Sequence, residues 1–228
     1  MWRVCSNGWA WIPYVQKDNA EACLIPVAPA KAGAQRLYAR PIKPLGPGLR
    51  RGDENMRTLI LGGARSGKSA LAERLASESA RDVVYIATAK AGDAEMAARI
   101  AHHRARRPQQ WLCVEEPIRL ADVLCEHARE HRCVLVDCLT LWLSNLLGDA
   151  DENAFERERT RLLDALPSLP GDVLMVSNEV GLGVVPLGEL TRRFVDEAGR
   201  LHQAIATVSE RVVFVAAGLP LVLKGTLP

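Results

Sequence analysis

Residues 62–69 have the types and the spacing of a loop that binds phosphate. They match the pattern G-x-x-x-x-G-K-S and are, in order, Gly62, Gly63, Ala64, Arg65, Ser66, Gly67, Lys68 and Ser69. The glycines let the backbone wrap a phosphate chain without Cβ clashes, so that successive N–H groups face the anion. Lys68 is expected to reach the β- and γ-phosphates, and the Ser69 hydroxyl is expected to bind Mg²⁺. The motif therefore predicts that this chain binds a nucleoside triphosphate.

The segments on either side of this loop predict a strand and a helix. Residues 58–61 form an apolar run typical of a buried strand, and residues 70–76 have the composition of a helix. A glycine-rich turn that matches the pattern by chance would lack this strand–loop–helix context.

Strand and helix patterns alternate through the rest of the chain. Apolar runs predict strands at 83–87, 111–114, 133–137, 173–177, 212–216 and, as an edge, 221–223. Helices are expected at 93–106, 118–130, 139–147, 152–166 and from the end of the glycine-rich loop 181–188 to about residue 208. This alternation predicts an α/β fold with a mainly parallel sheet that helices cover on both faces.

Polar residues follow several of these strands, at the edge of a parallel sheet where ligands bind. Asp137 ends an apolar strand, and its carboxylate is expected to bind Mg²⁺ opposite Ser69. The alternative is that Asp137 caps the following helix. Thr88 follows another strand, and its hydroxyl either contacts the nucleotide or the substrate or caps the next helix. Glu179 follows a third strand and is a candidate second carboxylate for a metal or a substrate.

Residues 99–107 place two adjacent histidines, His102 and His103, among four arginines. An imidazole near neutral pH is partly unprotonated and can attack phosphorus, while arginines neutralise phosphate charge. Neighbouring helical residues point about 100° apart, so at most one of the two histidines is expected to be a nucleophile. The alternative is the solvated basic end of a helix. The remaining histidines lack such neighbours and are interpreted as surface or structural residues: His127, His131 and His202.

The composition bounds the class of protein. The chain has 228 residues, of which 48% are hydrophobic and 25% charged, with a formal net charge of +2. These values fit one globular α/β domain and give no charge-based attraction to nucleic acid or membranes. No apolar run is long enough to span a bilayer. None of the six cysteines forms a C-x-x-C motif or a zinc pattern with histidine, which fits a cytoplasmic protein.

The first 55 residues differ from the rest of the chain. They contain six of the thirteen prolines and three of the five tryptophans, and no helical or strand period persists through them. We expect residues 1–55 to be a disordered, loosely attached or non-native extension. Residues 56–228, which begin at Met56, are expected to form the functional domain.

Further motifs, taken with the phosphate-binding loop, resemble one known family. They are Y-I-A-T at 85–88, E-M-A-A-R-I-x-H-H-R at 95–104 with R-R-P after it, T-L-W-L-S-N-L-L at 140–147, S-N-E-V-G-x-G-V-V-P at 177–186 and A-G-L-P at 217–220. With the strand that ends at Asp137, this set resembles the adenosylcobinamide kinase / adenosylcobinamide-phosphate guanylyltransferase family of cobalamin biosynthesis. The resemblance covers essentially all of residues 56–228 and none of residues 1–55.

The resemblance implies a RecA-like, three-layer P-loop NTPase fold and two reactions. The first is phosphorylation of adenosylcobinamide by ATP or GTP, with Mg²⁺ held by Ser69 and Asp137. The second is transfer of GMP from GTP to adenosylcobinamide phosphate through a guanylylated histidine. His103 fits the family's nucleophile best, because a basic residue follows it directly, and His102 is then the variable neighbour. Similar members are homotrimers, so the resemblance also implies a homo-oligomer.

The same resemblance implies nucleotide contacts beyond the phosphate-binding loop. These residues are Ala87, Thr88, Ala89, Arg104, Ala105, Arg106, Arg107, Glu115 and Asp137.

Three other classes of protein share the phosphate-binding loop. A monofunctional P-loop kinase for a small molecule would form no covalent nucleotide, and it is the alternative interpretation. A GTP-dependent switch needs the guanine-reading sequence N-K-x-D, which this chain lacks. A DNA-dependent ATPase is disfavoured because the net charge is near zero and basic residues do not alternate with aromatic ones.

Overall fold

The structure, a computed structural model, describes residues 10–14, 23–27, 55–90 and 108–228. The chain divides into two compact units, Met1–Gly48 and Leu49–Pro228. In the first unit, β1 (Ala10–Tyr14) pairs antiparallel with β2 (Cys23–Val27). Each of these strands has five residues and contains a proline, so neither gives a sequence period long enough to predict it. The assignment of residues 1–55 to an extension stays a prediction.

A seven-stranded sheet forms the centre of the second unit. Its strands are β3 (Arg57–Gly62), β4 (Asp82–Ala87), β5 (Leu112–Glu115), β6 (Arg132–Asp137), β7 (Asp172–Asn178), β8 (Arg211–Ala216) and β9 (Leu219–Lys224). Their order is β5-β4-β6-β7-β3-β8-β9, and among these strands only β8 and β9 pair antiparallel. The predicted α/β fold with a mainly parallel sheet is confirmed.

Strand β7 lies between β3 and β6 in this sheet. Strand β3 leads into the phosphate-binding loop, and β6 ends at Asp137. One strand inserted between these two is the arrangement of RecA-like P-loop domains, so the RecA-like fold is confirmed. Because β3, β7 and β6 are parallel neighbours, the residues that follow them share one edge of the sheet, where α/β proteins bind ligands.

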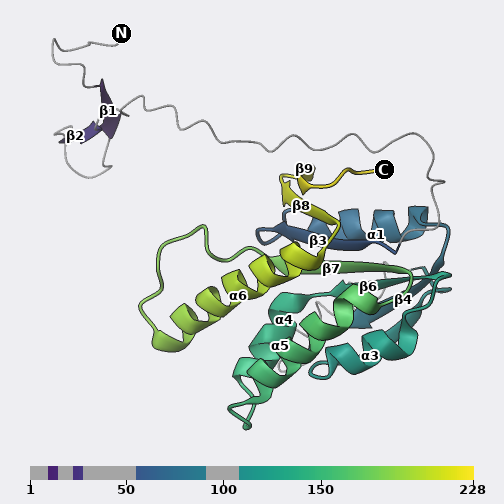
Figure 1. The fold of residues 1–228 in the computed structure, drawn as a ribbon. Coiled ribbons are helices and arrows are strands. Elements are labelled where there is room, and N and C mark those ends of the chain that lie inside the picture. The colour runs from purple at the N-terminus through teal and green to yellow at the C-terminus, as the bar shows by residue number, and fades with distance from the viewer. Residues whose placement is uncertain (1–9, 15–22, 28–54, 91–107) are drawn as a thin grey trace. The chain divides into compact units, whose positions relative to one another are not determined.

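Helices cover both faces of the sheet and give three layers (Figure 1). One face carries α1 (Lys68–Glu78). The other face carries α3 (Leu120–His127), α4 (Leu139–Leu147), α5 (Ala154–Ala165) with the short 3₁₀ turn Leu166–Ser168, and α6 (Glu189–Val208).

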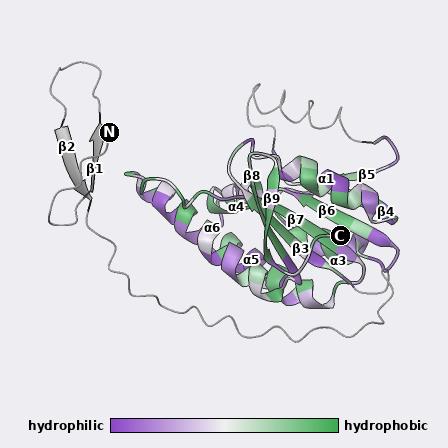
Figure 2. Cartoon of the chain, turned by 90° about the horizontal axis from the view of Figure 1, so that it is seen from above, coloured by the Kyte–Doolittle hydropathy of each residue, from purple (hydrophilic) through white to green (hydrophobic). Residues whose placement is uncertain are grey.

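Alternate residues of the strands pack into two separate cores. Ile60 belongs to the cluster that contains Leu71 and Leu75 of α1. Its neighbour Leu59 belongs to the cluster on the other face, which contains residues of α3, α4, α5 and α6. The central strands therefore form nearly continuous hydrophobic runs, as parallel strands buried on both faces do (Figure 2). No described helix is long and apolar enough to cross a membrane.

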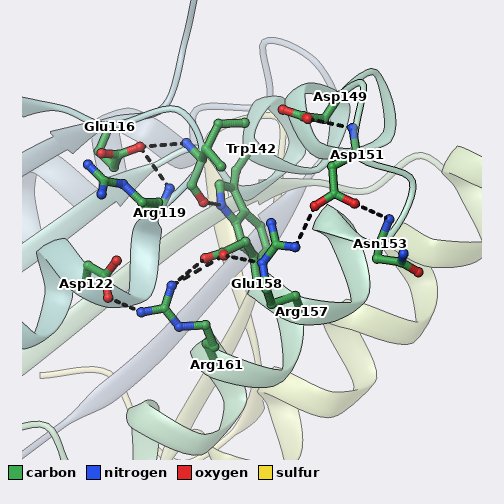
Figure 3. Close-up of polar contacts among 11 residues, drawn as sticks. Glu116, Arg119, Asp122, Trp142, Asp149, Asp151, Asn153, Arg157, Glu158 and Arg161 are labelled. Carbon is green, nitrogen blue, oxygen red and sulfur yellow. Dashed lines mark hydrogen bonds and ion pairs between the residues drawn. The ribbon is translucent and has the colours of Figure 1, made fainter.

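Helix α3 is shorter than the helix predicted at 118–130. The Glu116 carboxylate accepts hydrogen bonds from the N–H groups of Ile118 and Arg119, at 2.9 and 2.8 Å (Figure 3). These bonds hold a turn before the helix, and Arg119 has a non-helical backbone. At the other end Ala128 is extended, so the helix stops at His127. The helix predicted at 93–106 lies outside the described residues.

A cluster of charged side chains ties α5 to α3 (Figure 3). The buried carboxylate of Glu158 accepts from Arg157 and Arg161, each at 3.3 Å. Arg161 also pairs with Asp122 on α3. Because Glu158 is only 3% exposed, these partners offset the cost of burying its charge.

Candidate nucleotide-binding site

The phosphate-binding loop connects the end of β3 to the start of α1, as predicted. A Cβ on Gly62 would lie 2.5 Å from Val215 O and 2.6 Å from Ser66 Oγ. Gly67 has a φ of 98°, and a Cβ there would lie 3.1 Å from Gly218 Cα. The first position needs glycine for close packing, and the second needs it also for its left-handed backbone.

Backbone hydrogen bonds fix the shape of this loop. Gly218 N donates to Ser66 O over 2.8 Å, and Ser66 N donates to Gly63 O over 3.3 Å. Helix α1 has no side-chain cap at its N-terminus. Its first N–H groups therefore remain available to an anion, and the helix dipole favours one there.

Lys68 is buried at the start of α1 and lies against the loop. Its ammonium donates a hydrogen bond to Gly63 O over 3.1 Å. Burial lowers the pKa of Lys68, while electrostatic interactions with Cys138 and Asp137 oppose that shift. A phosphate bound beside the ammonium would further favour its charged form.

Asp137 ends β6, and the hydroxyl of Tyr85 on the neighbouring strand β4 donates to its Oδ2 over 2.9 Å. The N-cap of the following helix α4 is Cys138, so the interpretation of Asp137 as a helix cap is wrong.

The Asp137 carboxylate and the Ser69 hydroxyl are hard oxygen ligands of the kind that Mg²⁺ prefers. In the described part of the chain, no three His, Cys, Asp or Glu residues gather as a metal site. A small oxygen donor set suits Mg²⁺, which keeps water and phosphate ligands.

Thr88 follows β4 and is completely buried. Its hydroxyl donates to Cys138 O over 2.7 Å and accepts from Cys138 N over 2.9 Å. The Asn145 side chain donates to Thr88 O and Pro117 O, at 2.8 and 3.1 Å. Thr88 thus joins the segment after β4 to the segment after β6. Its predicted contact with the nucleotide stays a prediction.

Ala87 and Glu115 are register partners at the carboxyl ends of β4 and β5. The next residue, Glu116, donates its backbone N–H to Ala87 O over 3.0 Å. Ala89 follows Thr88, so the described nucleotide-contact candidates outside the loop all lie at the sheet edge that carries the loop. Their contacts with nucleotide stay predictions.

The basic segment with its candidate nucleophile lies outside the described residues. The roles assigned to these residues stay predictions: His102, His103, Arg104, Ala105, Arg106 and Arg107.

A buried polar chain at the end of β7 was not predicted as a unit. Ser177 Oγ lies 2.7 Å from His202 Nε2 and 3.1 Å from Thr140 Oγ1. Thr140 Oγ1 accepts from Asn178 N over 2.6 Å, and His202 Nδ1 lies 3.6 Å from Glu179 Oε2. The run S-N-E at the end of an apolar strand was the available signal, but nothing in the sequence paired it with His202.

His202 is a structural residue, in agreement with its interpretation from sequence. It is buried on α6, and burial lowers its pKa while Glu179 opposes the shift. Glu179 also accepts a hydrogen bond from Gly181 N over 2.7 Å. The Glu179 carboxylate thus has two partners within the protein, Gly181 and His202.

The glycine-rich loop, the buried lysine beside it, the strand-end carboxylate and the RecA-like strand order together define the class. This chain is a P-loop protein, and its candidate nucleotide site lies at the carboxyl edge of a parallel sheet. Residues 58–223 match the model of the CobU family, described as cobinamide kinase / cobinamide phosphate guanyltransferase. Because this match spans most of the chain, the chain belongs to that family of enzymes.

Curated relatives agree with the family model. The bifunctional adenosylcobalamin biosynthesis protein CobP of Pseudomonas aeruginosa is 65% identical over 170 residues, which cover 75% of this chain and 98% of that protein. The bifunctional adenosylcobalamin biosynthesis proteins CobU of Escherichia coli and Salmonella typhimurium are 40% and 38% identical over 182 residues. Each alignment covers 74% of this chain and 100% of the relative. The family resemblance drawn from the motifs is confirmed.

Proposed function

We propose that this enzyme phosphorylates the aminopropanol hydroxyl of adenosylcobinamide with a nucleoside triphosphate. It then transfers GMP from GTP to the resulting phosphate. The observation that carries the proposal is a P-loop with a buried lysine, set beside a strand-end carboxylate, in a chain of the cobinamide kinase / cobinamide phosphate guanyltransferase family. Relatives that are 65% and 40% identical are named bifunctional adenosylcobalamin biosynthesis proteins.

In the kinase step, the described residues bind and orient the triphosphate. The loop N–H groups and the start of α1 hold the β- and γ-phosphates, and Lys68 adds positive charge beside them. Ser69 and Asp137 would hold Mg²⁺, which neutralises phosphate charge. The substrate hydroxyl oxygen forms a bond to the γ-phosphorus and loses its proton, and the bond from that phosphorus to the nucleoside diphosphate breaks.

In the transferase step, His103 is the proposed nucleophile. An imidazole nitrogen forms a bond to the α-phosphorus of GTP, and pyrophosphate leaves. A phosphate oxygen of adenosylcobinamide phosphate then displaces the imidazole and gives adenosylcobinamide-GDP. Arg104, Arg106 and Arg107 are proposed to stabilise the charge of the departing pyrophosphate.

Two matched variants test the nucleophile. Wild-type enzyme incubated with GTP carrying ³²P on the α-phosphate should gain an acid-labile, alkali-stable label. His103→Ala should lose that label and guanylyl transfer while it still phosphorylates adenosylcobinamide, and His102→Ala should keep both. Label retained by His103→Ala would assign the nucleophile elsewhere.

A monofunctional kinase is the second candidate, because the described part of the site contains the groups for phosphoryl transfer. Incubation with adenosylcobinamide, ATP and GTP, with products identified by mass, separates the two functions. A phosphorylated corrinoid without any GDP adduct or protein label would favour the monofunctional kinase.

We also propose that the enzyme is a homotrimer. Side chains on the segment before α6 and at its start expose apolar surface: Leu182, Val184, Val185, Leu187 and Leu190. This segment and the first turns of α6 extend away from the sheet (Figure 1). Such a concentration of exposed apolar side chains is typical of an interface.

Light scattering tests the trimer and should give three times the 24.9 kDa chain mass. The double substitution Val184→Asp with Leu187→Asp should lower the measured mass. A monomeric wild type would contradict the trimer.

A further inference from the structure

Arg65 is the second basic residue of the phosphate-binding loop, beside Lys68, and the kinase step proposed above gives its side chain no role. It occupies a variable position of the pattern G-x-x-x-x-G-K-S, so the pattern itself does not explain an arginine there. Arg65 and Ala64 form the tip of a turn, which the hydrogen bond from Ser66 N to Gly63 O closes over 3.3 Å. Both residues of this tip are exposed.

The backbone of Arg65 has a conformation that favours glycine. Its φ is 56°, in the left-handed region, where a Cβ atom crowds the following carbonyl oxygen. Arg65 is the third residue of the turn, and glycine would adopt a left-handed φ there without that cost. Backbone strain of this kind clusters at functional sites, so the arginine calls for an explanation beyond the fold.

The Arg65 side chain adds no polar contact to the fold. Within the part of the chain that the structure describes, no hydrogen bond or ion pair holds its guanidinium. A guanidinium carries five N–H donors in a planar fork that fits the oxygens of a phosphate. An exposed arginine is ordinary by itself, but this one lies on the strained turn of a phosphate-binding loop. Its donors are available to an anion.

The two cations of the loop serve different sides of it. Lys68 is 8% exposed, and its ammonium donates to Gly63 O over 3.1 Å, so it lies among the loop atoms. The loop N–H groups converge on the phosphates of the nucleotide. The exposed Arg65 side chain instead faces solvent, the direction from which a second substrate must approach a bound nucleotide.

A neighbouring contact holds the backbone of Arg65 in place. The next residue, Ser66, accepts a hydrogen bond at its backbone oxygen from Gly218 N over 2.8 Å. The Arg65 Cα is therefore fixed relative to the rest of the loop. Only the side chain has to become ordered when it binds an anion, which limits the entropic cost of binding.

We propose that the Arg65 guanidinium binds the phosphate group of the phosphorylated corrinoid, a phosphate monoester, in the guanylyl transfer step. This phosphate and those of the nucleotide are all negatively charged, so a cation beside them offsets their repulsion. Adenosylcobinamide, the substrate of the kinase step, has a hydroxyl in place of this phosphate. The contact therefore favours the phosphorylated corrinoid as acceptor. This inference rests on the proposed function, because it takes that corrinoid as the second substrate.

Steady-state kinetics of the full chain tests the contact. In Arg65→Ala the KM for adenosylcobinamide phosphate should rise by about tenfold or more, as for a lost hydrogen bond between charged groups. The KM for adenosylcobinamide in the kinase step and the Kd for GTP should each change by no more than about twofold, the range of a substitution that removes no contact. Arg65→Lys keeps the charge without the planar fork and should give an intermediate KM.

The exposed residue Arg74, on the same helix α1 that follows the loop, provides the matched control. Arg74→Ala should leave all three constants unchanged. An equal loss of affinity for GTP in Arg65→Ala would assign the guanidinium to the nucleotide and overturn the inference. An unchanged KM for the phosphorylated corrinoid would overturn it as well.

The variant Arg65→Gly separates the binding role from an effect on the shape of the loop. It removes the guanidinium, so the KM for adenosylcobinamide phosphate should rise as much as in Arg65→Ala. It also relieves the left-handed backbone, so it should melt at a higher temperature than Arg65→Ala. A KM close to that of the wild type in Arg65→Gly would show that loop shape sets the affinity and would overturn the inference.

The failures of the two proposals are distinguishable. A wild type that forms no GDP adduct of the corrinoid would contradict the proposed function. A wild type that forms this adduct, with an Arg65→Ala variant of unchanged KM, would contradict only the role of Arg65.

Discussion

The Tyr85 hydroxyl donates a hydrogen bond to Oδ2 of Asp137 over 2.9 Å, between the neighbouring parallel strands β4 and β6. Tyr85 is 1% exposed, and its ring packs in the core on the α1 side. Packing therefore fixes where the hydroxyl lies. Tyr85 therefore orients the carboxylate at the candidate metal position. It belongs to the Y-I-A-T motif, which by itself does not predict this role for the tyrosine.

Removal of this hydroxyl should weaken the response to Mg²⁺. Tyr85→Phe keeps the ring but leaves Asp137 less restrained, so the Mg²⁺ concentration for half-maximal kinase rate should rise by about threefold to tenfold. Initial rates at saturating substrates over a series of Mg²⁺ concentrations measure the effect. An unchanged Mg²⁺ dependence in a well-folded variant would show that Tyr85 does not orient a metal ligand.

His202 should make the stability of the fold depend on pH. Burial lowers its pKa below the usual 6.5, so in this range the unfolded chain binds a proton that the native protein does not. His202 therefore lowers the free energy of unfolding progressively as the pH falls from 6.5 to its native pKa, and it does not lower it above pH 6.5. Urea unfolding at several pH values measures the slope.

The variant His202→Gln provides the comparison for that slope. It lacks the titrating imidazole, while the other ionisable groups contribute to both proteins. Its stability should change less than that of the wild type as the pH falls. Parallel curves for the two proteins would contradict the prediction.

Thiol reactivity should separate two exposed cysteines of the second unit, Cys113 and Cys125, from two buried ones, Cys133 and Cys138. Burial raises the pKa of Cys133 to about 12 and that of Cys138 to about 11, whereas Cys113 and Cys125 are exposed. Alkylation needs the thiolate and access to it. Brief treatment of the native protein at mildly alkaline pH should label Cys113 and Cys125 and spare the buried pair. Peptide mass spectrometry, with a urea-unfolded sample as control, reads the labels.

Two glycine substitutions should differ sharply in their effect on stability. Gly171 has a φ of +75°, and a Cβ there would overlap Arg129 O and Arg132 O. Gly171→Ala should lower the free energy of unfolding by about 2 kcal/mol or more. Gly183, with no atom within 4 Å of its Cβ position, should tolerate alanine within about 0.5 kcal/mol. Similar denaturation midpoints for the two variants would contradict this difference.

The loop and the sheet were predictable because their signals are local. Gly62 and Lys68 stand at fixed offsets in one short motif, and buried parallel strands give apolar runs such as that of β6. The N-terminus of α3 was harder to predict, because the Glu116 side chain, rather than helix propensity, decides where that helix begins.

The polar chain at the end of β7 could not be predicted from sequence, because its partners come from distant parts of the chain. Thr140 lies on α4 and His202 on α6, and the fold alone brings both to Ser177. A histidine without charged neighbours in sequence gives no sign of the carboxylate that it meets in space.

The hydrogen bond from Gly218 N to Ser66 O joins the phosphate-binding loop to the turn between β8 and β9. During synthesis the loop leaves the ribosome long before that turn does. A nascent chain therefore contains all eight residues of the motif before it contains the Gly218 N–H group that bonds to the loop. A chain cut before Ala217 would therefore retain the motif but lose this hydrogen bond to it.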